Sequence, residues 1–398
     1  MNHLKTIIIT FFITLLLVSS VFAFILYSKD DSQNEKVTED MATDSMVIPA
    51  SQRITRNDSI SGSRGNIITE TVQQVSPAVV GINVIEIREY RSPWYDLFQN
   101  DPMWQDLLRR RQKVQGLGSG AIISPDGYII TNDHVAGNAV EVIVTLTDGT
   151  QYEADVIGSD QASDICLLKI KGENLPYIKL GNSSDILIGE WAIALGNPFG
   201  LFDINDKPTV TVGVISATGM NLGQVNNRYY VNMIQTDAAI NGGNSGGPLV
   251  NSYGELIGMN TLIFTAQGSR GNVGVGFAIP VDKVKKIVAE LKSHSKVDRD
   301  FWTGLRIQAV DKGIANYYNL KNTRGVIVTS ISPDSPASKA DLEVGDIILQ
   351  VDKYKINDDE TLIGVLQEFK TGDTVTFKIL RDNQSYTKQM KLERKNDQ

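Results

Sequence analysis

Short apolar runs separated by glycine-rich turns fill residues 66–280, and they limit the folds open to this chain more than any other feature. The stretch Val140–Leu146 places Val or Leu at every second position, and the turn-forming pair Asp148-Gly149 follows it. Runs of similar length recur at 118–124, 128–131, 165–170, 191–195, 210–217 and 255–261. The pattern therefore predicts an all-β unit built as a barrel or a pair of barrels.

Composition excludes several classes of protein. The chain has 398 residues, which is enough for two or three domains with sizeable cores. Its 38 Lys and Arg against 46 Asp and Glu give a net charge of −8, which argues against a nucleic-acid binder. The single cysteine, Cys166, excludes both an intrachain disulfide and a zinc site made of several cysteines.

The N-terminus carries an uncharged segment, Thr6–Ser28, that is long enough to span a membrane as one helix. Lys5 precedes it, which favours export of the rest of the chain from the cytoplasm. Val21-Phe22-Ala23 also fits the cleavage site of a signal peptide, and this alternative stays open. The apolar run continues to Tyr27, which favours an uncleaved anchor.

The chain after residue 28 divides by composition. Residues 29–65 are polar and predict a flexible tether. The aromatic-rich insert Glu89–Arg111 predicts a flap, a subunit contact or a surface helix. Val281–His294 has the apolar spacing of an amphipathic helix. Residues 293–300 predict a linker, and a second unit follows with strands at 325–330 and 347–351 and a helix near 361–369.

Residues Asn241–Leu249 read NGGNSGGPL and supply a candidate nucleophile, Ser245. The glycines around it allow a sharp turn and free backbone N–H groups for an oxyanion hole. A nucleophilic serine needs a base, and the chain has only three histidines. His3 lies beside the membrane segment and His294 beside the linker, so His134 is the candidate base.

The base needs a carboxylate that orients its ring. Asp164 opens an apolar strand, DICLLKI, and is the candidate, although a turn residue at that place would read the same way. Asp133 is the competitor, but adjacent side chains on an extended segment point to opposite faces. The order His134, Asp164, Ser245 therefore predicts a catalytic triad.

These residues and their surroundings resemble the HtrA/Deg family of chymotrypsin-like serine proteases. The matching motifs are GSG at 118–120, TNDHV at 131–135, SDICLLKI at 163–170, ALGNPFG at 194–200, QTDAAINGGNSGGPLVN at 235–251 and GFAIP at 276–280. The resemblance implies a mainly β chain, with one transmembrane helix before a double β-barrel protease domain and one α+β PDZ domain. It divides the chain into 1–28 anchor or signal, 29–65 tether, 66–292 trypsin-like protease domain, 293–300 linker and 301–394 PDZ domain.

The resemblance also implies roles for individual residues. His134 takes the proton of Ser245, Asp164 orients His134, and the N–H groups of Gly243 and Ser245 form the oxyanion hole. Ala239 falls at the floor of the primary specificity pocket and offers no charge, so we expect cleavage after small or medium aliphatic residues. Three further residues line that pocket or pack in the core, namely Ile240, Leu262 and Ile263. Asp133 and Cys166 depart from the usual family residues, and we expect Cys166 to be a buried small hydrophobe.

The C-terminal unit resembles one PDZ domain, with WTGL at 302–305 and GVIVTSISPDSPASKADLEVGDIILQVD at 325–352. This implies that Thr303–Leu305 bind a C-terminal carboxylate and that Leu305–Val310 add the peptide as a strand. The apolar residues spaced along 362–369 wall the groove or belong to the core. The expected peptide-binding residues are Thr303, Gly304, Leu305, Ile307, Leu362, Val365 and Leu366.

One anchor, one protease domain and one PDZ domain resemble the membrane-anchored DegS-like branch. That implies a homotrimer anchored in the inner membrane by a single span, with its protease domain in the periplasm and Arg228 as the transmitting contact of a sensor loop, Met220–Tyr229. Cleavage of a signal peptide would instead give a soluble periplasmic protein. The long Glu89–Arg111 insert resembles the long regulatory loop of DegP-like quality-control proteases.

The function expected from these features is that of an ATP-independent serine endopeptidase that needs no cofactor or metal. Its substrates would be unfolded proteins or a stress-signalling protein. The alternatives are a non-proteolytic PDZ peptide sensor or chaperone and, with less support, an esterase.

Overall fold

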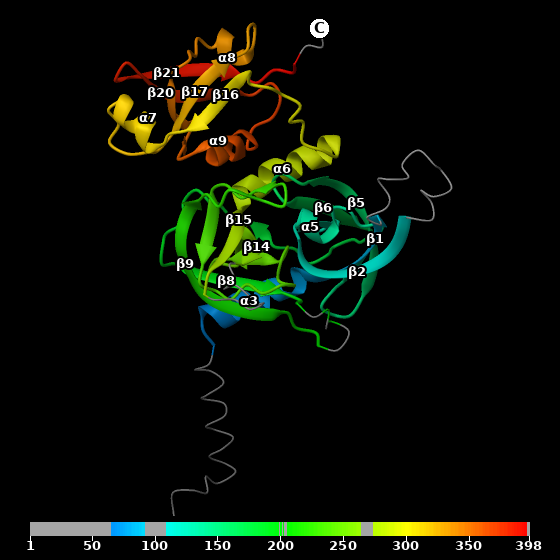
Figure 1. The fold of residues 1–398 in the computed structure, drawn as a ribbon. Coiled ribbons are helices and arrows are strands. Elements are labelled where there is room, and N and C mark those ends of the chain that lie inside the picture. Colours follow the sequence, from blue (N-terminus) through cyan, green and yellow to red (C-terminus); the bar gives the residue numbers. More distant parts are fainter. Residues whose placement is uncertain are drawn as a thin grey trace, which may run out of the picture. The chain divides into compact units, whose positions relative to one another are not determined.

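The computed structural model describes residues 65–91, 109–198, 200, 202, 205–263 and 274–395. The chain splits into two compact units, Met1–Arg64 and Gly65–Gln398, and the description below concerns the second (Figure 1). The predicted anchor at 1–28 and nearly all of the tether lie outside the described residues. Within the described ranges, no helix combines the length and apolarity needed to cross a membrane.

The first barrel follows a short helix, α3 (Ile67–Val75), whose N-terminus is capped by the side chain of Asn66. Its strands close in the order β1-β2-β3-β6-β5-β4. They are β1 (Val79–Arg91), β2 (Arg109–Ile122), β3 (Tyr128–Thr131), β4 (Glu141–Thr145), β5 (Gln151–Asp160) and β6 (Ile165–Ile170). The second and third of the predicted runs, at 128–131 and 165–170, are therefore confirmed as β3 and β6.

The second barrel is a seven-stranded sheet, β13-β8-β9-β12-β15-β14-β7, which a further β13–β14 pairing closes. Its strands are β7 (Lys179–Leu180), β8 (Trp191–Gly196), β9 (Thr209–Met220), β12 (Met233–Thr236), β13 (Pro248–Val250), β14 (Glu255–Ile263) and β15 (Gly276–Pro280). A small hairpin, β10 (Gln224–Val225) and β11 (Arg228–Tyr229), lies in the connection between β9 and β12. The prediction of a pair of barrels is confirmed.

Alternation along β4 has one exception at its start. Val142, Val144 and Leu146 are buried, as the two-residue period predicts. Val140 is 61% exposed, because the strand begins only at Glu141 and residue 140 belongs to the preceding turn. The period therefore gave the buried face correctly but placed the strand one residue too early.

The helix predicted at 281–294 is confirmed as α6 (Val281–His294). Pro280 stands directly before it, and Ser295 ends it in a left-handed conformation. Its buried side chains are Val281, Val284, Ile287, Val288 and Leu291. These five form the predicted apolar stripe, and they pack in the same core cluster as the first barrel.

The aromatic-rich insert is entered and left by strands. Glu89 pairs with Arg111 and Arg91 with Arg109, so β1 and β2 extend the barrel hairpin into the insert. Residues 92–108, which carry four of its five aromatic residues, lie outside the described ranges. The flap, subunit-contact and helix interpretations therefore stay predictions.

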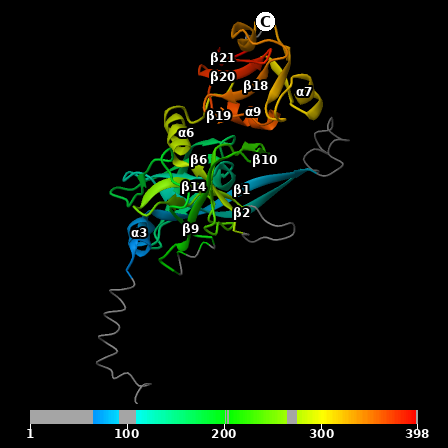
Figure 2. The ribbon, with the colours of Figure 1, turned by 90° about the vertical axis from the view of Figure 1, so that its left-hand side faces the viewer.

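The C-terminal unit contains a sheet in the order β16-β17-β18-β20-β21, with β19 paired to β18. Figure 2 shows β18, β19, β20 and β21 of this sheet. Its strands are β16 (Leu305–Ala309), β17 (Val326–Ile331), β18 (Ile347–Val351), β19 (Tyr354–Lys355), β20 (Thr374–Arg381) and β21 (Gln384–Lys391). Its helices are α7 (Lys312–Tyr317), α8 (Pro336–Lys339) and α9 (Asp359–Leu366). The strand predicted at 347–351 is confirmed. The helix predicted near 361–369 begins earlier, because Asp358 caps its N-terminus, and it ends at Leu366.

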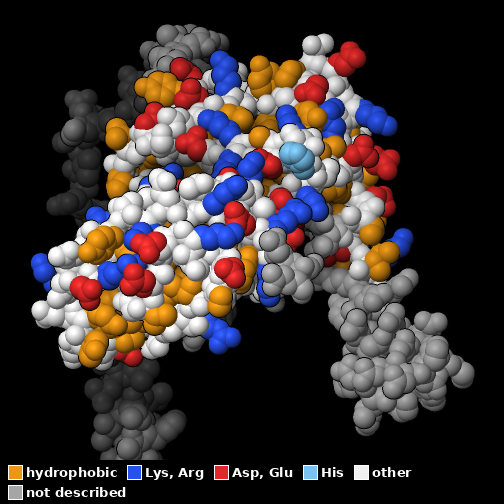
Figure 3. Space-filling view, turned by 90° about the horizontal axis from the view of Figure 1, so that it is seen from above, with side chains coloured by type: hydrophobic (Ala, Val, Ile, Leu, Met, Phe, Trp, Pro, Cys, Tyr) orange, Lys and Arg blue, Asp and Glu red, His pale blue; other side chains and the backbone are white. Residues whose placement is uncertain are grey.

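The surface seen in Figure 3 mixes both signs of charge. Lys and Arg side chains lie among Asp and Glu side chains, and in the described part of this face no single sign forms a continuous patch.

Candidate active site

Strand pairing brings His134 and Asp164 together across 30 residues. β3 and β6 pair antiparallel with Thr131 opposite Cys166, so the residues just after β3 face those just before β6. His134 stands in the first turn of α5 (Asp133–Ala136), directly after β3. The amide of Asn132 donates a 3.0 Å hydrogen bond to the backbone oxygen of Asp164 and fixes this junction.

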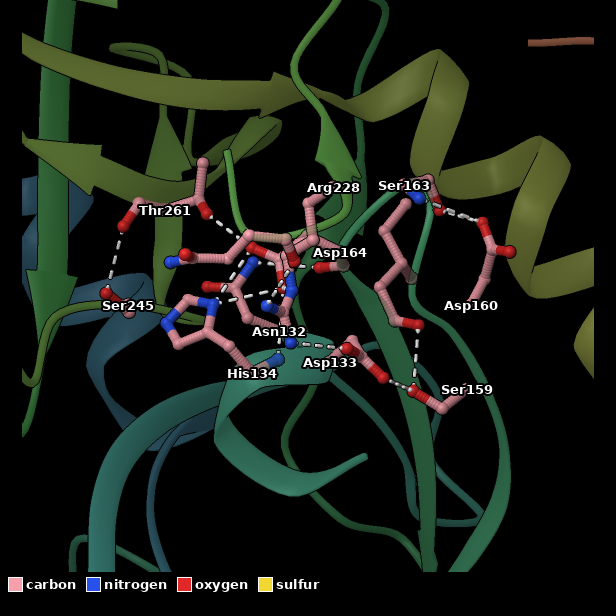
Figure 4. Close-up of polar contacts among 12 residues, drawn as sticks. Asn132, Asp133, His134, Ser159, Asp160, Ser163, Asp164, Arg228, Ser245 and Thr261 are labelled. Atoms are coloured by element: carbon pink, nitrogen blue, oxygen red, sulfur yellow. Dashed lines mark hydrogen bonds and ion pairs between the residues drawn. The ribbon is translucent and has the colours of Figure 1, made fainter. Parts of the chain in front are cut away.

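The carboxylate of Asp164 faces the ring of His134 (Figure 4). His134 Nδ1 lies 2.9 Å from Oδ2 and 3.0 Å from Oδ1, and the backbone N–H of His134 donates a further 3.0 Å bond to Oδ1. Asp164 is fully buried, whereas the His134 side chain is 34% exposed. The buried carboxylate can therefore hold the ring while the other nitrogen stays accessible.

The pKa of Asp164 lies below its ordinary value. Burial alone would raise it, but hydrogen bonds from His134 and the charge of His134 outweigh burial, and the hydroxyl of Thr261 adds a 2.8 Å bond. The phenol of Tyr230 donates another bond of 3.1 Å. The site thus keeps an ionised carboxylate in a dry environment, as the stabilisation of an imidazolium requires.

The competing carboxylate, Asp133, points elsewhere. It accepts bonds from Ser159 Oγ at 2.6 Å and from Arg228 Nη2 at 2.7 Å. Among the described contacts it makes none with the His134 ring. The side chains of Asp133 and His134 therefore point apart, as predicted, although residue 133 begins a helix and does not continue the strand.

Ser245 lies on the turn between β12 and β13 in the second barrel. Its Oγ donates a 3.0 Å hydrogen bond to the backbone oxygen of Thr261, and the described contacts include no hydrogen bond from Ser245 to His134. Figure 4 shows the Ser245 hydroxyl beside Thr261 and near the edge of the His134 ring. In this conformation the candidate nucleophile bonds to Thr261 and not to the candidate base.

Ser119 of the first barrel holds the nucleophile loop. Its N–H donates to the backbone oxygen of Ser245 at 3.0 Å, and its hydroxyl donates to the backbone oxygen of Gly243 at 2.5 Å. The same hydroxyl accepts a 2.7 Å bond from the N–H of Asn197. One buried serine thus ties β2 to the loop that carries Ser245.

The loop offers two donors to an oxyanion. Gly243 has φ +107°, a conformation that L side chains rarely adopt, and its Cα packs against the backbone of Pro198. Within the described residues, the N–H groups of Gly243 and Ser245 donate no hydrogen bond to another backbone group. They are therefore available to a negative oxygen at the carbonyl that Ser245 would attack.

Comparisons with known families agree with this geometry. The trypsin-like peptidase domain family matches residues 118–259, and the PDZ domain family matches residues 304–392. A probable periplasmic serine endoprotease, DegP-like, of Pseudomonas fluorescens is 41% identical over 331 residues, which cover 79% of this chain and 67% of the relative. The corresponding protein of a Marinomonas species is 39% identical over 350 residues, covering 83% and 72%.

Solved structures are similar as well. The HtrA-type protease AlgWS227A with decapeptide has a TM-score of 0.64 and 35% identity, covering 83% of this chain and 98% of that one. The serine endoprotease from Yersinia pestis has a TM-score of 0.53 and 33% identity, covering 83% and 99%. The chain belongs to the HtrA/Deg family of serine proteases. It is a serine endopeptidase with one PDZ domain.

The predicted specificity pocket of this HtrA/Deg protease is only partly described. Ala239 is half-buried, and its backbone oxygen accepts a 2.8 Å bond from Thr211. Ile240 is fully buried in the core of the second barrel and packs against Gly276, so its side chain does not line an open pocket. The side chains of Leu262 and Ile263 lie outside the described residues, although their backbone pairs with β15.

The predicted peptide groove lies between β16 and α9. Within the described sheet β16 pairs only with β17, so its other edge is open to an added strand. The N–H of Leu305 already donates to Thr303 Oγ1 at 3.2 Å, and Gly304 has φ +75°. Leu362 and Val365 are fully buried in the domain core, whereas Leu366, Leu305 and Ile307 are half-buried. The core interpretation therefore holds for Leu362 and Val365, and the latter three side chains pack against the same core but stay partly exposed.

Three residues contact the site without having been predicted as site residues, and two of them, Tyr230 and Thr261, lie in none of the motifs. Tyr230 and Thr261 reach the carboxylate of Asp164 from the second barrel, and Ser119 reaches the nucleophile loop from the first. Arg228, which the sequence suggested for a sensor loop, also contacts Asp164, with Nε 3.0 Å from Oδ1. Only the GSG motif hinted at one of these contacts, because the others join segments 64 to 97 residues apart.

Proposed function

We propose that Ser245, His134 and Asp164 form the catalytic triad of this endopeptidase. The observation that carries the proposal is the buried Asp164 carboxylate 2.9 Å from His134 Nδ1, beside a serine on a loop with two free N–H donors. Rotation of the Ser245 hydroxyl from Thr261 toward His134 would place its proton on Nε2 as the serine attacks a peptide carbonyl. Gly243 and Ser245 N–H groups would then hold the oxyanion.

The specificity pocket has no charged side chain at its expected floor. Ala239 is half-buried and uncharged, and this supports cleavage after small or medium aliphatic residues. A cationic P1 side chain would leave water without gaining a partner, which costs several kcal/mol. We therefore propose unfolded or signalling proteins as substrates, cut at Ala, Val or similar residues.

The PDZ domain supplies a second recognition surface. The open edge of β16, next to the half-buried Leu305, Ile307 and Leu366, supports binding of an apolar peptide C-terminus as an added strand. The N–H of Leu305 must leave Thr303 Oγ1 before it can bind a carboxylate. Such a peptide would act as a regulator or as the tail of a captured substrate.

Location and assembly follow from the sequence and from relatives. The uncharged run Thr6–Ser28 supports a single inner-membrane span with the protease domain in the periplasm, where the similar DegP-like endoproteases act. Cleavage after Ala23 would give a soluble periplasmic protein instead. The DegS-like domain arrangement supports a homotrimer.

The test is β-casein cleavage by the full chain, with and without a peptide that ends in aromatic residues, and with Ser245→Ala as control. Sequencing of the products should find small or medium aliphatic residues on the N-terminal side of the cut bonds. Cleavage only with peptide would indicate a gated signalling protease. Cleavage without peptide would indicate protein quality control.

The hydroxyl of Ser245 favours the gated form, because it is bonded to Thr261 and not to His134. If wild type and Ser245→Ala are equally inert in both conditions, the proposed triad is wrong. A non-proteolytic peptide sensor or chaperone would then be the better assignment.

A further inference from the structure

We propose that Arg228 and Asp133 are positioning residues whose paired charges set the basicity of His134. The proposal rests on the roles of His134 and Asp164 given above. Arg228 is a cation that shares the carboxylate of Asp164 with His134. Asp133 is a second carboxylate, and it binds Arg228.

Arg228 and His134 bind the same oxygen. Nε of Arg228 and Nδ1 of His134 both lie 3.0 Å from Oδ1 of Asp164. Figure 4 shows both side chains at this carboxylate. The Arg228 side chain is only 12% exposed and Asp164 is fully buried, so water screens this interaction poorly. The burial of Arg228 opposes its charge, but Asp164 and Asp133 together raise the pKa of Arg228, which keeps it cationic.

The backbone around Arg228 fixes this contact. The N–H of Tyr229 donates 2.8 Å to the backbone oxygen of Ala162, in the turn that carries Asp164. Arg228 and Tyr230 lie two residues apart, so their side chains leave the same face of the chain. One reaches Oδ1 of Asp164 and the other reaches Oδ2, and the carboxylate is held between them.

Asp133 holds the far side of the guanidinium. Its Oδ2 accepts from Arg228 Nη2 at 2.7 Å, and its Oδ1 accepts from Ser159 at 2.6 Å. Asp133 is almost completely buried, so this second carboxylate is matched to the cation in a site of low polarity. Asp133 and Arg228 therefore form a neutral pair that joins α5 to β11 directly beside the base.

Other titratable groups near Asp164 are the same in every variant considered below. Tyr230 stays a neutral phenol, because burial and the charge of Asp164 raise its pKa. The Cys166 thiol of β6 stays neutral for the same reason. Glu86 of β1 lines, with His134, Asn138 and Arg228, a cavity of about 610 Å³ beside the base.

The charge of each residue predicts the direction in which its loss shifts the pKa of His134. Arg228 disfavours protonation of His134 and competes for Oδ1, so loss of Arg228 should raise the pKa of His134. Loss of the Asp133 charge leaves the cation unopposed, so it should lower that pKa. A change in both residues removes a neutral pair and should leave the pKa close to that of the wild type.

The experiment measures the pKa of His134 directly in the full chain. Histidine labelled with ¹³C at Cε1 gives only three signals, from His3, His134 and His294. They are titrated in Ser245→Ala protein carrying Arg228→Gln, Asp133→Asn, both or neither. The same three variants with Ser245 intact give the acid limb of kcat/KM against pH on β-casein fragments.

We expect Arg228→Gln to raise the pKa of His134 by about one pH unit and Asp133→Asn to lower it by a similar amount. The double variant should lie within about 0.3 pH units of the reference. Shifts in the same direction, or no shift in either single variant, would overturn the proposal. A merely structural role would lower activity without a reversal of sign.

Two further readouts separate folding and function from the proposal. The His294 signal and thermal unfolding report whether each variant folds. Arg228→Gln leaves two buried carboxylates unpaired. If it does not fold for that reason, Asp133→Asn and the double variant still test the proposal. The pKa of His134 must fall in Asp133→Asn and must return close to the reference value in the double variant. If the wild type cleaves no casein with or without the peptide while the titration shows the expected signs, the proposed triad fails and the charge pair stands.

Discussion

Arg299 and Asp160 form a forked ion pair, with Nη2 of the arginine 2.9 Å from Oδ2 of the aspartate. Nη1 bonds the other oxygen, and Nε donates 2.6 Å to the backbone oxygen of Gln367. Asp160 also accepts the hydroxyl and the N–H of Ser163, the residue before Asp164. A residue predicted as linker thus connects the C-terminal domain to the turn of the catalytic site.

The first prediction concerns this pair. Arg299→Met leaves a buried carboxylate without its partner and should cost about 3 kcal/mol of unfolding free energy. The double variant Arg299→Met, Asp160→Asn should cost clearly less than the sum of the two single changes, with a coupling of about 1–3 kcal/mol in urea denaturation. Additive costs would show that the two side chains do not interact.

Replacement of Asp164 by asparagine should lower kcat about 10⁴-fold with little change in KM. The amide can hold His134 in the wrong tautomer and cannot stabilise the imidazolium. The measurement is casein-peptide hydrolysis at pH 8, and Asp126→Asn, at the exposed turn that precedes β3, is the matched control, because His134 follows the other end of that strand. A loss below tenfold for Asp164→Asn would contradict the assigned role.

Acid should destabilise the wild type more than Asp164→Asn. The pKa of Asp164 is lower in the fold than its ordinary 3.8, so its ionisation stabilises the fold above pH 4. This contribution is lost as the pH falls through the lowered pKa. Urea denaturation between pH 7 and pH 2.5, also in 0.5 M NaCl, should show a steeper loss for the wild type. Parallel curves would show that another group dominates.

The single thiol should be inert in the folded protein. Cys166 is fully buried on β6, and burial raises its pKa to about 12. At pH 8 almost no thiolate is present, and a disulfide reagent cannot reach the sulfur until the barrel opens. Labelling should be at least about 100-fold faster in urea than in buffer. Stoichiometric labelling of native protein within minutes would exclude this account.

Gly364 of α9 lies so close to the side chain of Val231 that a larger residue would clash with it. A Cβ atom at this position would lie 2.9 Å from Cγ2 of Val231. Among the described residues before position 300, only Val231 belongs to the buried core cluster of the C-terminal domain. Gly364→Ala should therefore destabilise by about 1 kcal/mol, although alanine is the better helix former. Ile363→Ala, on the exposed side of α9, should change stability by less than about 0.5 kcal/mol. A more stable Gly364→Ala protein would contradict the contact.

Much of the fold was predictable because its signals are local. Short apolar runs between glycine-rich turns predicted several strands of the barrels, the two-residue period predicted β4, and the spacing of Val281, Val284 and Leu291 predicted α6. Errors occurred at element ends, as at Val140, where a side chain continues the pattern but its backbone belongs to a turn. Capping by Asp358 moved the start of α9 in the same way.

The sequence by itself determined which groups have the chemistry. Only three histidines and one serine in a glycine-rich loop left few choices, and His134, Asp164 and Ser245 could be named from residue type and motif. The tertiary structure alone decided what surrounds them. The contacts of Arg228, Tyr230 and Thr261 with Asp164 depend on how two barrels and a hairpin pack, and no local periodicity records a contact across 64 or more residues. Residue type determines the charge of a side chain, but the fold determines which carboxylate a cationic side chain pairs with.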